Sequence, residues 1–259
     1  MKTLEITSSA NAQFKIFKSL LTSKGIKENK LFILSGQKLV DEFIQNPVPG
    51  FILEYVLFQD ELKVSVEAKN TRLSSDLFKE LDVLGTHYNL LVLSFNSFLA
   101  KDLNLNPVGL EIICPLGDPR NLGSLIRSAA GFGVNQLILT SEATHPFLPH
   151  CLKASAGAAL KINIVLAQKK LCEIPMTGEN FALELHGTDL ALVQWPANLR
   201  LWVGEEGPGL GLVHEQKRVM KFVNIKTKNI ESLNATVSSS LALWQWSQQK
   251  AKTLAATES

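Results

Sequence analysis

Three short segments of the chain carry residue types that can bind a ligand or take part in a reaction. They cover residues 117–123, 203–211 and 230–236, and they contain glycines, carboxylates, asparagines and, shortly after the first segment, an arginine. Each segment follows an apolar run that predicts a β-strand. In a parallel sheet covered by helices, ligands bind in the loops after the carboxyl ends of the strands. These loops therefore form the candidate functional site.

The first segment, residues 117–123 (GDPRNLG), leads into a helix predicted over residues 121–130. Asn121 is expected at the start of this helix, where its amide can cap backbone N–H groups. Gly123 and Arg127 are four residues apart, so they lie on one face, and the glycine leaves room beside the guanidinium. Taken alone, this segment is better explained by a capped helix with a solvated arginine than by a site.

The second segment, residues 203–211 (VGEEGPGLG), contains four glycines, of which Gly204 is the first. Glycines let the backbone bend sharply and approach a ligand closely. The spacing is not the Gly-x-Gly-x-x-Gly of dinucleotide-binding loops, and the Lys-Ser/Thr of a P-loop is missing. The adjacent carboxylates of Glu205 and Glu206 oppose a phosphate and favour a ligand that is positively charged or carries hydroxyl groups. The alternative is a glycine-rich turn with solvated acids.

The third segment, residues 230–236 (IESLNAT), opens another predicted helix. Ser232 and Asn234 favour the first turn of a helix, which explains them without a function. The tripeptide that starts at Asn234 also matches a glycosylation acceptor. We expect no use of it, because residues 1–5 lack the apolar start of a secretory signal.

The composition excludes several classes of protein. The 259 residues are 46% hydrophobic and 19% charged with a formal net charge of +2, which is typical of a globular protein and excludes predominant disorder. No run approaches the roughly 18 apolar residues of a membrane span, so no membrane partner is expected. Cys114, Cys151 and Cys172 form no Cys-x-x-Cys pair, and no histidines have metal-ligand spacing, so we expect neither a disulfide framework nor a metal site. The predicted location is the cytoplasm.

The apolar pattern of the first hundred residues predicts a small α/β unit. Helices are expected over residues 9–21, 39–43 and 76–84, and strands over residues 31–34, 52–58, 71–73 and 90–95. Six lysines precede Leu31, at positions 2, 15, 18, 24, 27 and 30. Such a cluster can follow a phosphate backbone, although a solvated helix face explains it equally well.

The second half of the chain alternates strands and helices more plainly. Strands are expected over residues 110–116, 134–140, 161–166, 199–203 and 222–225, with the helix over 121–130 between the first two. This pattern predicts an α/β fold with a mostly parallel sheet covered by helices. The polar segment 101–107 ends in proline and is the predicted linker. We therefore expect two domains, residues 1–105 and 106–259.

Together, the three segments resemble the motifs of the SpoU (TrmH) family of RNA ribose 2′-O-methyltransferases, in the SPOUT superfamily. The family's three motifs occur here in order: DPRNLG with Arg127, GEEGPGL at residues 204–210, and Ser232-Leu233-Asn234. The resemblance covers residues 108–250. The N-terminal unit is similar to the small ribosomal-protein-like substrate-binding domain of many members.

Two places differ from the family's pattern. Glu205 stands where an asparagine or a small residue is usual. Residues 225–230 lack the usual proline–methionine and are one residue short.

The resemblance implies a fold and a cofactor that local patterns do not predict. It implies a C-terminal SPOUT domain whose chain threads through a loop in a trefoil knot, a feature that is very rare in proteins. It also implies S-adenosylmethionine as cofactor, bound through the backbone around Gly204, Ile225 and Leu233.

For the reaction, the resemblance places Arg127 at the ribose 2′-hydroxyl, with Asn121, Glu206, Ser232 and Asn234 orienting the arginine and the ribose. A ribose hydroxyl is a poor nucleophile until it loses its proton. Because a guanidinium is protonated at neutral pH, we expect Arg127 to bind the adjacent phosphate and the hydroxyl and to stabilise alkoxide character. Any role as a base is conditional on RNA binding.

The expected partners are RNA and a second copy of the chain. Ribosomal RNA is favoured slightly over transfer RNA by analogy alone, with residues 1–105 selecting the RNA. Family members pair through the knotted domain, and the C-terminal helix carries more apolar surface than one sheet face needs, at Leu241, Leu243, Trp244 and Trp246. The alternative is that these side chains pack only on their own sheet.

Two other functions compete with this interpretation. The first is a non-catalytic RNA-binding or ribosome-assembly factor on the same scaffold, which the intact Asn121, Arg127, Glu206 and Asn234 oppose. The second is a nicotinamide-dependent oxidoreductase with a Rossmann fold, which the missing Gly-x-Gly-x-x-Gly opposes.

Overall fold

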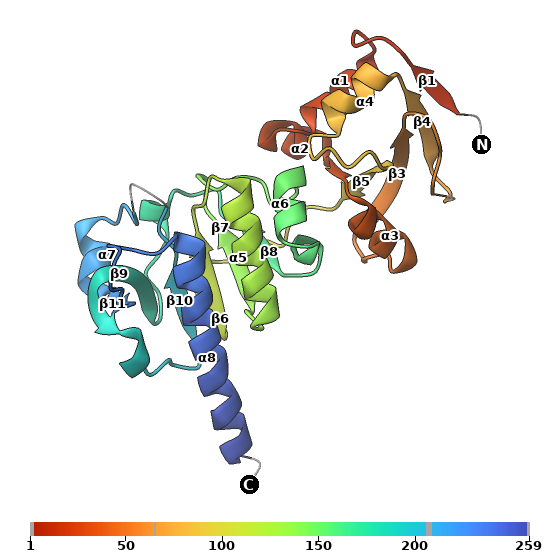
Figure 1. Ribbon diagram of the computed structural model, residues 1–259. Helices are drawn as coiled ribbons and strands as arrows, with labels where there is room; N and C mark the ends of the chain where they lie inside the picture. The colour runs from red at the N-terminus through yellow and green to blue at the C-terminus, as the bar shows by residue number, and fades with distance from the viewer. Residues whose placement is uncertain (1–2, 65, 206–208, 258–259) are drawn as a thin grey trace. The chain divides into compact units, whose positions relative to one another are not determined.

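A computed structural model of the chain describes residues 3–64, 66–205 and 209–257. The chain forms two compact units, each with its own sheet (Figure 1). Unit 1 comprises Met1–Ser97 and His145–Lys161, and unit 2 comprises Phe98–Thr144 and Ile162–Ser259. The segment 145–161, which the sequence pattern assigns to the second domain, therefore packs in unit 1, and the first boundary falls at residue 97 rather than 105.

Unit 1 is built on a mixed five-stranded sheet in the order β1-β4-β3-β5-β2. Strands β1, β4 and β3 are parallel, whereas β5 is antiparallel to both of its neighbours. The strands are β1 (Leu4–Ile6), β2 (Leu31–Leu34), β3 (Phe51–Phe58), β4 (Lys69–Leu73) and β5 (Leu90–Phe95). The helical elements are α1 (Ala12–Ser19), α2 (Ser23–Asn29), α3 (Gln37–Gln45), α4 (Ser75–Leu81), α6 (Pro149–Ala154) and the 3₁₀ turn η1 (Ala158–Leu160).

The helix expected over residues 9–21 is shorter, and a second helix follows it at once. The Asn11 side chain accepts hydrogen bonds from the first turn of α1, and Thr22 caps α2 in the same way. The two caps therefore divide the polypeptide into two short helices. The apolar stripe is nevertheless correct, because Phe14, Phe17 and Leu20 are fully buried.

Unit 2 contains the predicted parallel sheet, with six strands in the order β11-β9-β10-β6-β7-β8. All five strand pairs are parallel. The strands are β6 (Leu110–Cys114), β7 (Gln136–Leu139), β8 (Ile164–Leu166), β9 (Asn180–Asp189), β10 (Leu199–Trp202) and β11 (Lys221–Asn224). The helical elements are α5 (Pro119–Gly131), α7 (His214–Val219), α8 (Ala235–Thr257) and the turns η2 (Leu171–Glu173) and η3 (Leu190–Leu192).

The segment predicted as a linker is held against unit 2 by a buried ion network. Glu111 on β6 accepts a hydrogen bond from Lys101 Nζ at 2.5 Å and another from Arg200 Nε at 3.2 Å. The fully buried Arg200 also donates from Nη2 to the Leu105 carbonyl at 2.8 Å. Because a buried charge without its partner is costly, this network fixes residues 101–105 in unit 2.

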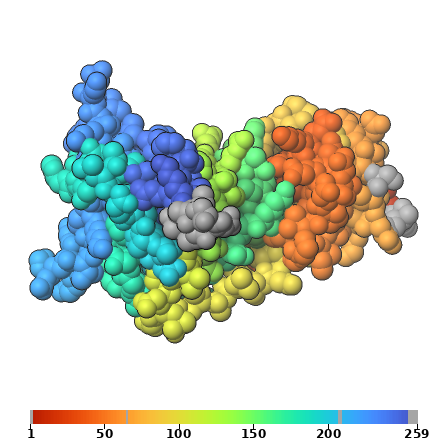
Figure 2. Space-filling view, turned by 90° about the horizontal axis from the view of Figure 1, so that it is seen from below, coloured from red at the N-terminus to blue at the C-terminus, as the bar shows by residue number. Residues whose placement is uncertain are grey.

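Helices α5 and α8 lie side by side in unit 2 (Figure 1). In the space-filling view, α8 (dark blue) forms part of the outer surface next to α5 (yellow-green) (Figure 2). Within the residues that the structure describes, no helix has the length and apolar character needed to cross a membrane.

Candidate functional site

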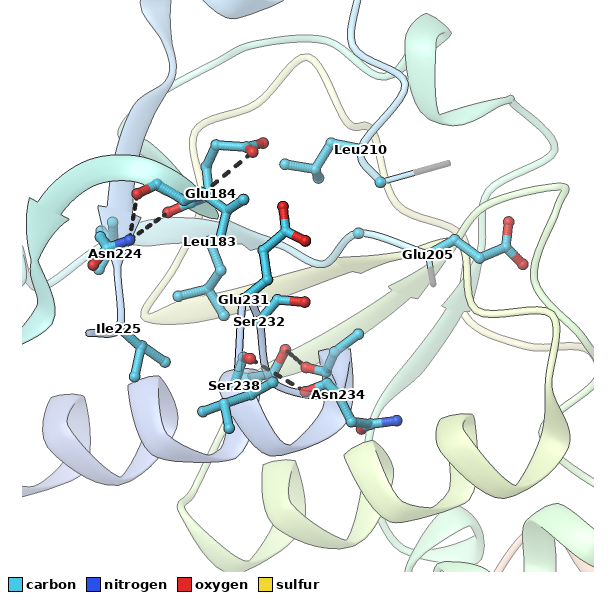
Figure 3. Close-up of a pocket in the computed structure, with 17 residues that line it drawn as sticks. Leu183, Glu184, Glu205, Leu210, Asn224, Ile225, Glu231, Ser232, Asn234 and Ser238 are labelled. Atoms are coloured by element: carbon cyan, nitrogen blue, oxygen red, sulfur yellow. Dashed lines mark hydrogen bonds between the residues drawn. The ribbon is translucent and has the colours of Figure 1, made fainter. Parts of the chain in front are cut away.

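A pocket of about 520 Å³ opens at the carboxyl ends of β10 and β11 (Figure 3). This volume lies in the range of roughly 300–1,000 Å³ that is typical of small-molecule sites. The residues that the resemblance assigns to the cofactor, Gly204, Ile225 and Leu233, all line it. The other described residues in the wall include Leu183, Glu184, Leu185, Glu205, Gly209, Leu210, Asn224, Glu231, Ser232, Asn234 and Ser238.

The charged groups of this pocket are all acidic in the part of the wall that the structure describes. They are Glu184, Glu205 and Glu231, and no lysine, arginine or histidine lines the pocket there. Opposite charges attract more strongly near a protein surface than in bulk water. The pocket therefore favours a ligand with a positive centre.

The predicted residues Asn121 and Asn234 meet at the N-terminal ends of α5 and α8. Asn234 Nδ2 donates to Asn121 Oδ1 at 3.4 Å, and Thr236 Oγ1 donates to the Asn121 carbonyl at 3.2 Å. Asn234 Oδ1 in turn accepts from the backbone N–H of Thr236 at 2.9 Å. Asn234 is therefore both the cap of α8, as its residue type predicts, and the bridge to α5.

Asn121 does not cap α5, which corrects the sequence-based expectation. Asp118 takes that position, and its Oδ1 accepts from the N–H groups of Arg120 at 2.8 Å and Asn121 at 2.9 Å. The proline at position 119 starts the helix two residues earlier than predicted, because its fixed φ suits the first helical position. The Asn121 side chain is consequently available for its contact with Asn234.

The remaining predicted residues are Ser232, Arg127 and Glu206, and they lie in different places. Ser232 lines the pocket, next to Leu233. Arg127 is exposed on α5 and is not part of the described pocket wall. Glu206 lies outside the described residues.

Strand β9 contributes pocket residues that the sequence pattern missed. Asn224 Nδ2 donates to the carbonyls of Leu185 and, at 3.4 Å, Glu184, which holds this part of β9 against the end of β11 (Figure 3). Only the first residues of β9 are buried, and the exposed remainder carries mixed polar residues. The apolar run from Phe181 to Leu183 was the one available signal of this strand.

Ionisable groups beside the pocket have shifted pKa values with clear causes. Lys226 Nζ lies 2.7 Å from Asp189 Oδ2, and this hydrogen bond lowers the pKa of Asp189. At the end of β6, burial raises the pKa of the Cys114 thiol to about 12, with a smaller contribution from the Glu205 charge. Cys114 is therefore a neutral core residue.

The model of the SpoU rRNA methylase family matches residues 112–244, just over half of the chain. The chain belongs to this family. The matched range contains all three motif segments and all described residues of the pocket wall.

Relatives of this family member include proteins from several bacteria. "Ribosomal RNA small subunit methyltransferase G 2" of Syntrophobacter fumaroxidans is 33% identical over 254 residues, which are 96% of this chain but 50% of that protein. The chain thus spans about half the length of this relative. The 23S rRNA (guanosine(2553)-2′-O)-methyltransferase RlmP of Bacillus subtilis is 24% identical over 263 residues, which are 93% of this chain and 98% of that protein.

Solved structures of similar fold cover nearly the whole chain. The SpoU methyltransferase AviRb of Streptomyces viridochromogenes, in complex with AdoMet, superposes with a TM-score of 0.76 at 18% identity, over 93% of this chain and 98% of that one. An AdoMet-bound rRNA methyltransferase of Sinorhizobium meliloti gives a TM-score of 0.74 at 21% identity, over 95% and 98%. The α/β fold with its parallel sheet is therefore that of SpoU methyltransferases.

Proposed function

We propose that the protein transfers a methyl group from S-adenosylmethionine to a ribose 2′-hydroxyl of RNA. The observation that carries the proposal is the pocket lined by Gly204, Ile225 and Leu233, beside the contact between Asn121 and Asn234. Apart from Ile225, which follows β11, these residues come from the three motif segments, and all of them lie in the range that the SpoU rRNA methylase family model matches.

The chemistry of the pocket suits this cofactor. Its described wall holds three carboxylates and no cationic side chain, so a sulfonium centre is attracted electrostatically. Gly204 has no side chain, so its backbone can approach the edges of an adenine closely. When bound, S-adenosylmethionine supplies the electrophilic methyl group.

The residues around the pocket have distinct proposed roles in preparing the nucleophile. Arg127 binds the phosphate next to the target ribose and stabilises negative charge on the 2′-oxygen as its proton leaves. Asn121, Ser232 and Asn234 orient the ribose, and holding the two reactants in line supplies several kcal/mol of the barrier reduction. Glu206 belongs to the same proposal, although it lies outside the described residues.

Ribosomal RNA is the proposed substrate class, because the two relatives described above are named for it. Unit 1, as a ribosomal-protein-like domain, carries the selection of the RNA, and unit 2 carries the reaction. The reaction takes place in the cytoplasm, where rRNA is modified.

The chain path after β11 supports the proposed trefoil knot. Strand β11 is at one edge of the sheet, whereas α8 packs on α5, which follows the inner strand β6. The connection over residues 225–234 must therefore return across the carboxyl ends of the strands between them. A chain that crosses back in this way can thread behind a preceding loop.

A homodimer through unit 2 is the second part of the proposal. The groove between α5 and α8 exposes Val237, Leu241 and Trp244, and Trp244 is 53% exposed. Arg127 does not line the groove, but it lies on the same helix, one turn from the groove residue Ser124. A second copy seated there covers the apolar surface and approaches Arg127, which within one chain is outside the pocket.

The dimer predicts a clear effect of a charge in this groove. Trp244→Asp is expected to convert the protein to a monomer in sedimentation and to lower turnover at least tenfold, because an unpaired carboxylate opposes burial. A wild-type protein that sediments as a 28.5 kDa monomer at micromolar concentration contradicts the dimer.

The function itself is tested by mapping 2′-O-methyl sites in RNA from cells with and without the gene, together with purified variants. Arg127→Lys is expected to lose at least 100-fold in turnover while its affinity for S-adenosylmethionine is kept, because a lysine lacks the planar fork of the guanidinium. Arg218→Lys, at an exposed arginine on α7, is the matched control. If the wild-type chain binds no S-adenosylmethionine, and cells without the gene show the same RNA methylation as cells with it, the protein is instead a non-catalytic RNA-binding factor.

A further inference from the structure

Glu205 is the residue at which this chain departs from its family's usual second motif, and its backbone is fixed on both sides. Its N–H donates to the Gly209 carbonyl at 3.0 Å, and its carbonyl accepts from the Gly209 N–H at 3.0 Å. These two bonds form an antiparallel bridge between Glu205 and Gly209. The Cα–Cβ direction of Glu205 is therefore determined by the bridge.

The Glu205 side chain lies in the pocket wall and reaches a neighbouring loop. In Figure 3 its carboxylate points away from Ser232 and Glu231. Its Oε1 accepts a hydrogen bond from the backbone N–H of Gly117 at 3.2 Å. Because β6 and β10 are adjacent strands, the loops that follow them are neighbours, and a glutamate is long enough to connect them.

Gly117 leaves room for this carboxylate because it has no side chain. A Cβ atom built on Gly117 would lie 2.9 Å from Glu205 Oε1, which is closer than side chains tolerate. The backbone of Gly117 is outside the left-handed region, so an alanine there suffers no conformational strain. An alanine at position 117 would therefore displace the flexible Glu205 carboxylate at low cost, and the present contact needs the glycine.

The loop that Glu205 holds leads straight to the residues on the proposed ribose side. Asp118 follows Gly117 and caps α5, and Asn121 in the first turn contacts Asn234. A shift of this loop therefore moves the start of α5. Small misplacements of reacting or orienting groups reduce the rate of a bimolecular reaction strongly.

We propose that Glu205 is a positioning residue that links the cofactor pocket to the Gly117–Asn121 loop and so keeps the ribose-side residues in register with the cofactor. This proposal rests on the proposed methyltransferase function. It assigns the effect to the acceptor oxygen of Glu205, so glutamine can replace it and alanine cannot.

The link is tested first in the cofactor-free protein, by amide hydrogen exchange at Gly117. Glu205→Ala is expected to accelerate exchange of this N–H about tenfold or more, whereas Glu205→Gln keeps its protection because the amide oxygen still accepts. Equal exchange in wild type and Glu205→Ala would overturn the link.

The consequence is then tested by steady-state kinetics with RNA and S-adenosylmethionine. Glu205→Ala is expected to lower kcat about tenfold with less than a threefold change in KM for the cofactor, and Glu205→Gln to keep at least half of the wild-type kcat. Gly117→Ala, which displaces the carboxylate, is expected to lower kcat like Glu205→Ala and to add nothing in the double variant.

Glu231→Gln is the matched control, since it removes the same charge from the same pocket on another element. The effect of Glu231→Gln on kcat is expected to be additive with that of Gly117→Ala. Equal loss of kcat in Glu205→Gln and Glu205→Ala, or additivity between positions 117 and 205, overturns the positioning role. A wild-type chain that does not bind S-adenosylmethionine overturns the proposed function, and the catalytic consequence with it, while the exchange result still decides the link.

Discussion

His145 is a buried histidine in unit 1, surrounded by aromatic rings. Its ring centroid lies 5.3 Å from that of Phe147 and 5.9 Å from that of Phe95. His145 Nδ1 accepts from the Phe147 N–H at 3.1 Å, and the Ser23 hydroxyl oxygen accepts from the His145 N–H at 3.0 Å. Burial lowers the pKa of His145 to about 3, and the charges of Lys27 and Lys30 act in the same direction.

This pKa predicts a loss of stability in acid. Between the ordinary value of 6.5 and about 3, the unfolded chain binds a proton that the folded state excludes, so the free energy of unfolding falls as pH falls through this window. The contribution amounts to about 2 kcal/mol between pH 7 and pH 5. In His145→Asn, which keeps a short acceptor for the Phe147 N–H, we expect denaturant titrations to show a correspondingly flatter pH dependence.

The control for this prediction is His87→Asn. His87 is exposed and has a positive φ of 50°, which asparagine tolerates. Its substitution is expected to leave the acid dependence as in the wild type. If His145→Asn loses stability between pH 7 and pH 5 as steeply as the wild type does, His145 is not the group responsible.

At the scale of single elements, α5 depends on the cap at Asp118. The Asp118 carboxylate satisfies two N–H groups of the first turn and lies at the positive end of the helix dipole. Asp118→Ala is expected to lower the free energy of unfolding by about 1 kcal/mol, measured by urea denaturation. Asp118→Asn keeps the cap oxygen and is expected to lose less than half as much, so equal losses would show that the cap is not the cause.

Local patterns predicted most strands and helices of this protein because burial of one face imposes a period on the residues. The strand over residues 90–95 and the buried stripe of α1 follow directly from this rule. The period did not predict helix α2, since Ile26 is its one buried large side chain among polar residues. It did not predict strand β9 because most of the strand is exposed.

The candidate site was predicted from motifs rather than from a period. The resemblance to the SpoU family assigned Gly204, Ile225 and Leu233 to the cofactor, and these residues line one pocket. The link from Glu205 to Gly117 joins residues 88 positions apart, and no local period records such a contact. The packing of residues 145–161 in unit 1 is long-range in the same sense.

At the scale of the whole molecule, a truncation at the predicted domain boundary would remove residues that pack inside both units. A chain that starts near Asn106 lacks Lys101 and so removes a partner of the buried Glu111. It also lacks Phe32 and Phe95, whose rings lie 4.7 and 5.0 Å from the ring of Phe147. The proposed division of labour is therefore better tested by charge substitutions in the full-length protein.

The lysines of α1 and α2 provide that test. Lys18 is paired with Glu80 at 2.6 Å, Lys30 ends α2 with its amine over the Phe95 ring, and Lys2 lies outside the described residues. The exposed Lys15 and Lys27 remain as groups that can neutralise phosphates, together with Lys24, whose ion pair with Glu28 at 3.7 Å is exposed to solvent. Each phosphate contact releases counterions, so it strengthens binding to any RNA sequence and steepens the salt dependence.

The triple variant Lys15→Gln, Lys24→Gln and Lys27→Gln is therefore expected to bind RNA more weakly, with a slope of log K against log salt that is smaller by about 2. Affinity for S-adenosylmethionine is expected to stay as in the wild type, because the proposed pocket is built entirely from unit 2. Replacing Lys38, Lys63 and Lys69 by glutamine removes the same charge from other elements of unit 1 and should change the slope by less than half as much. Equal slopes in the two triple variants would mean that net charge, rather than the α1–α2 face, attracts the RNA. An unchanged slope in the first variant would show that Lys15, Lys24 and Lys27 do not contact RNA phosphates.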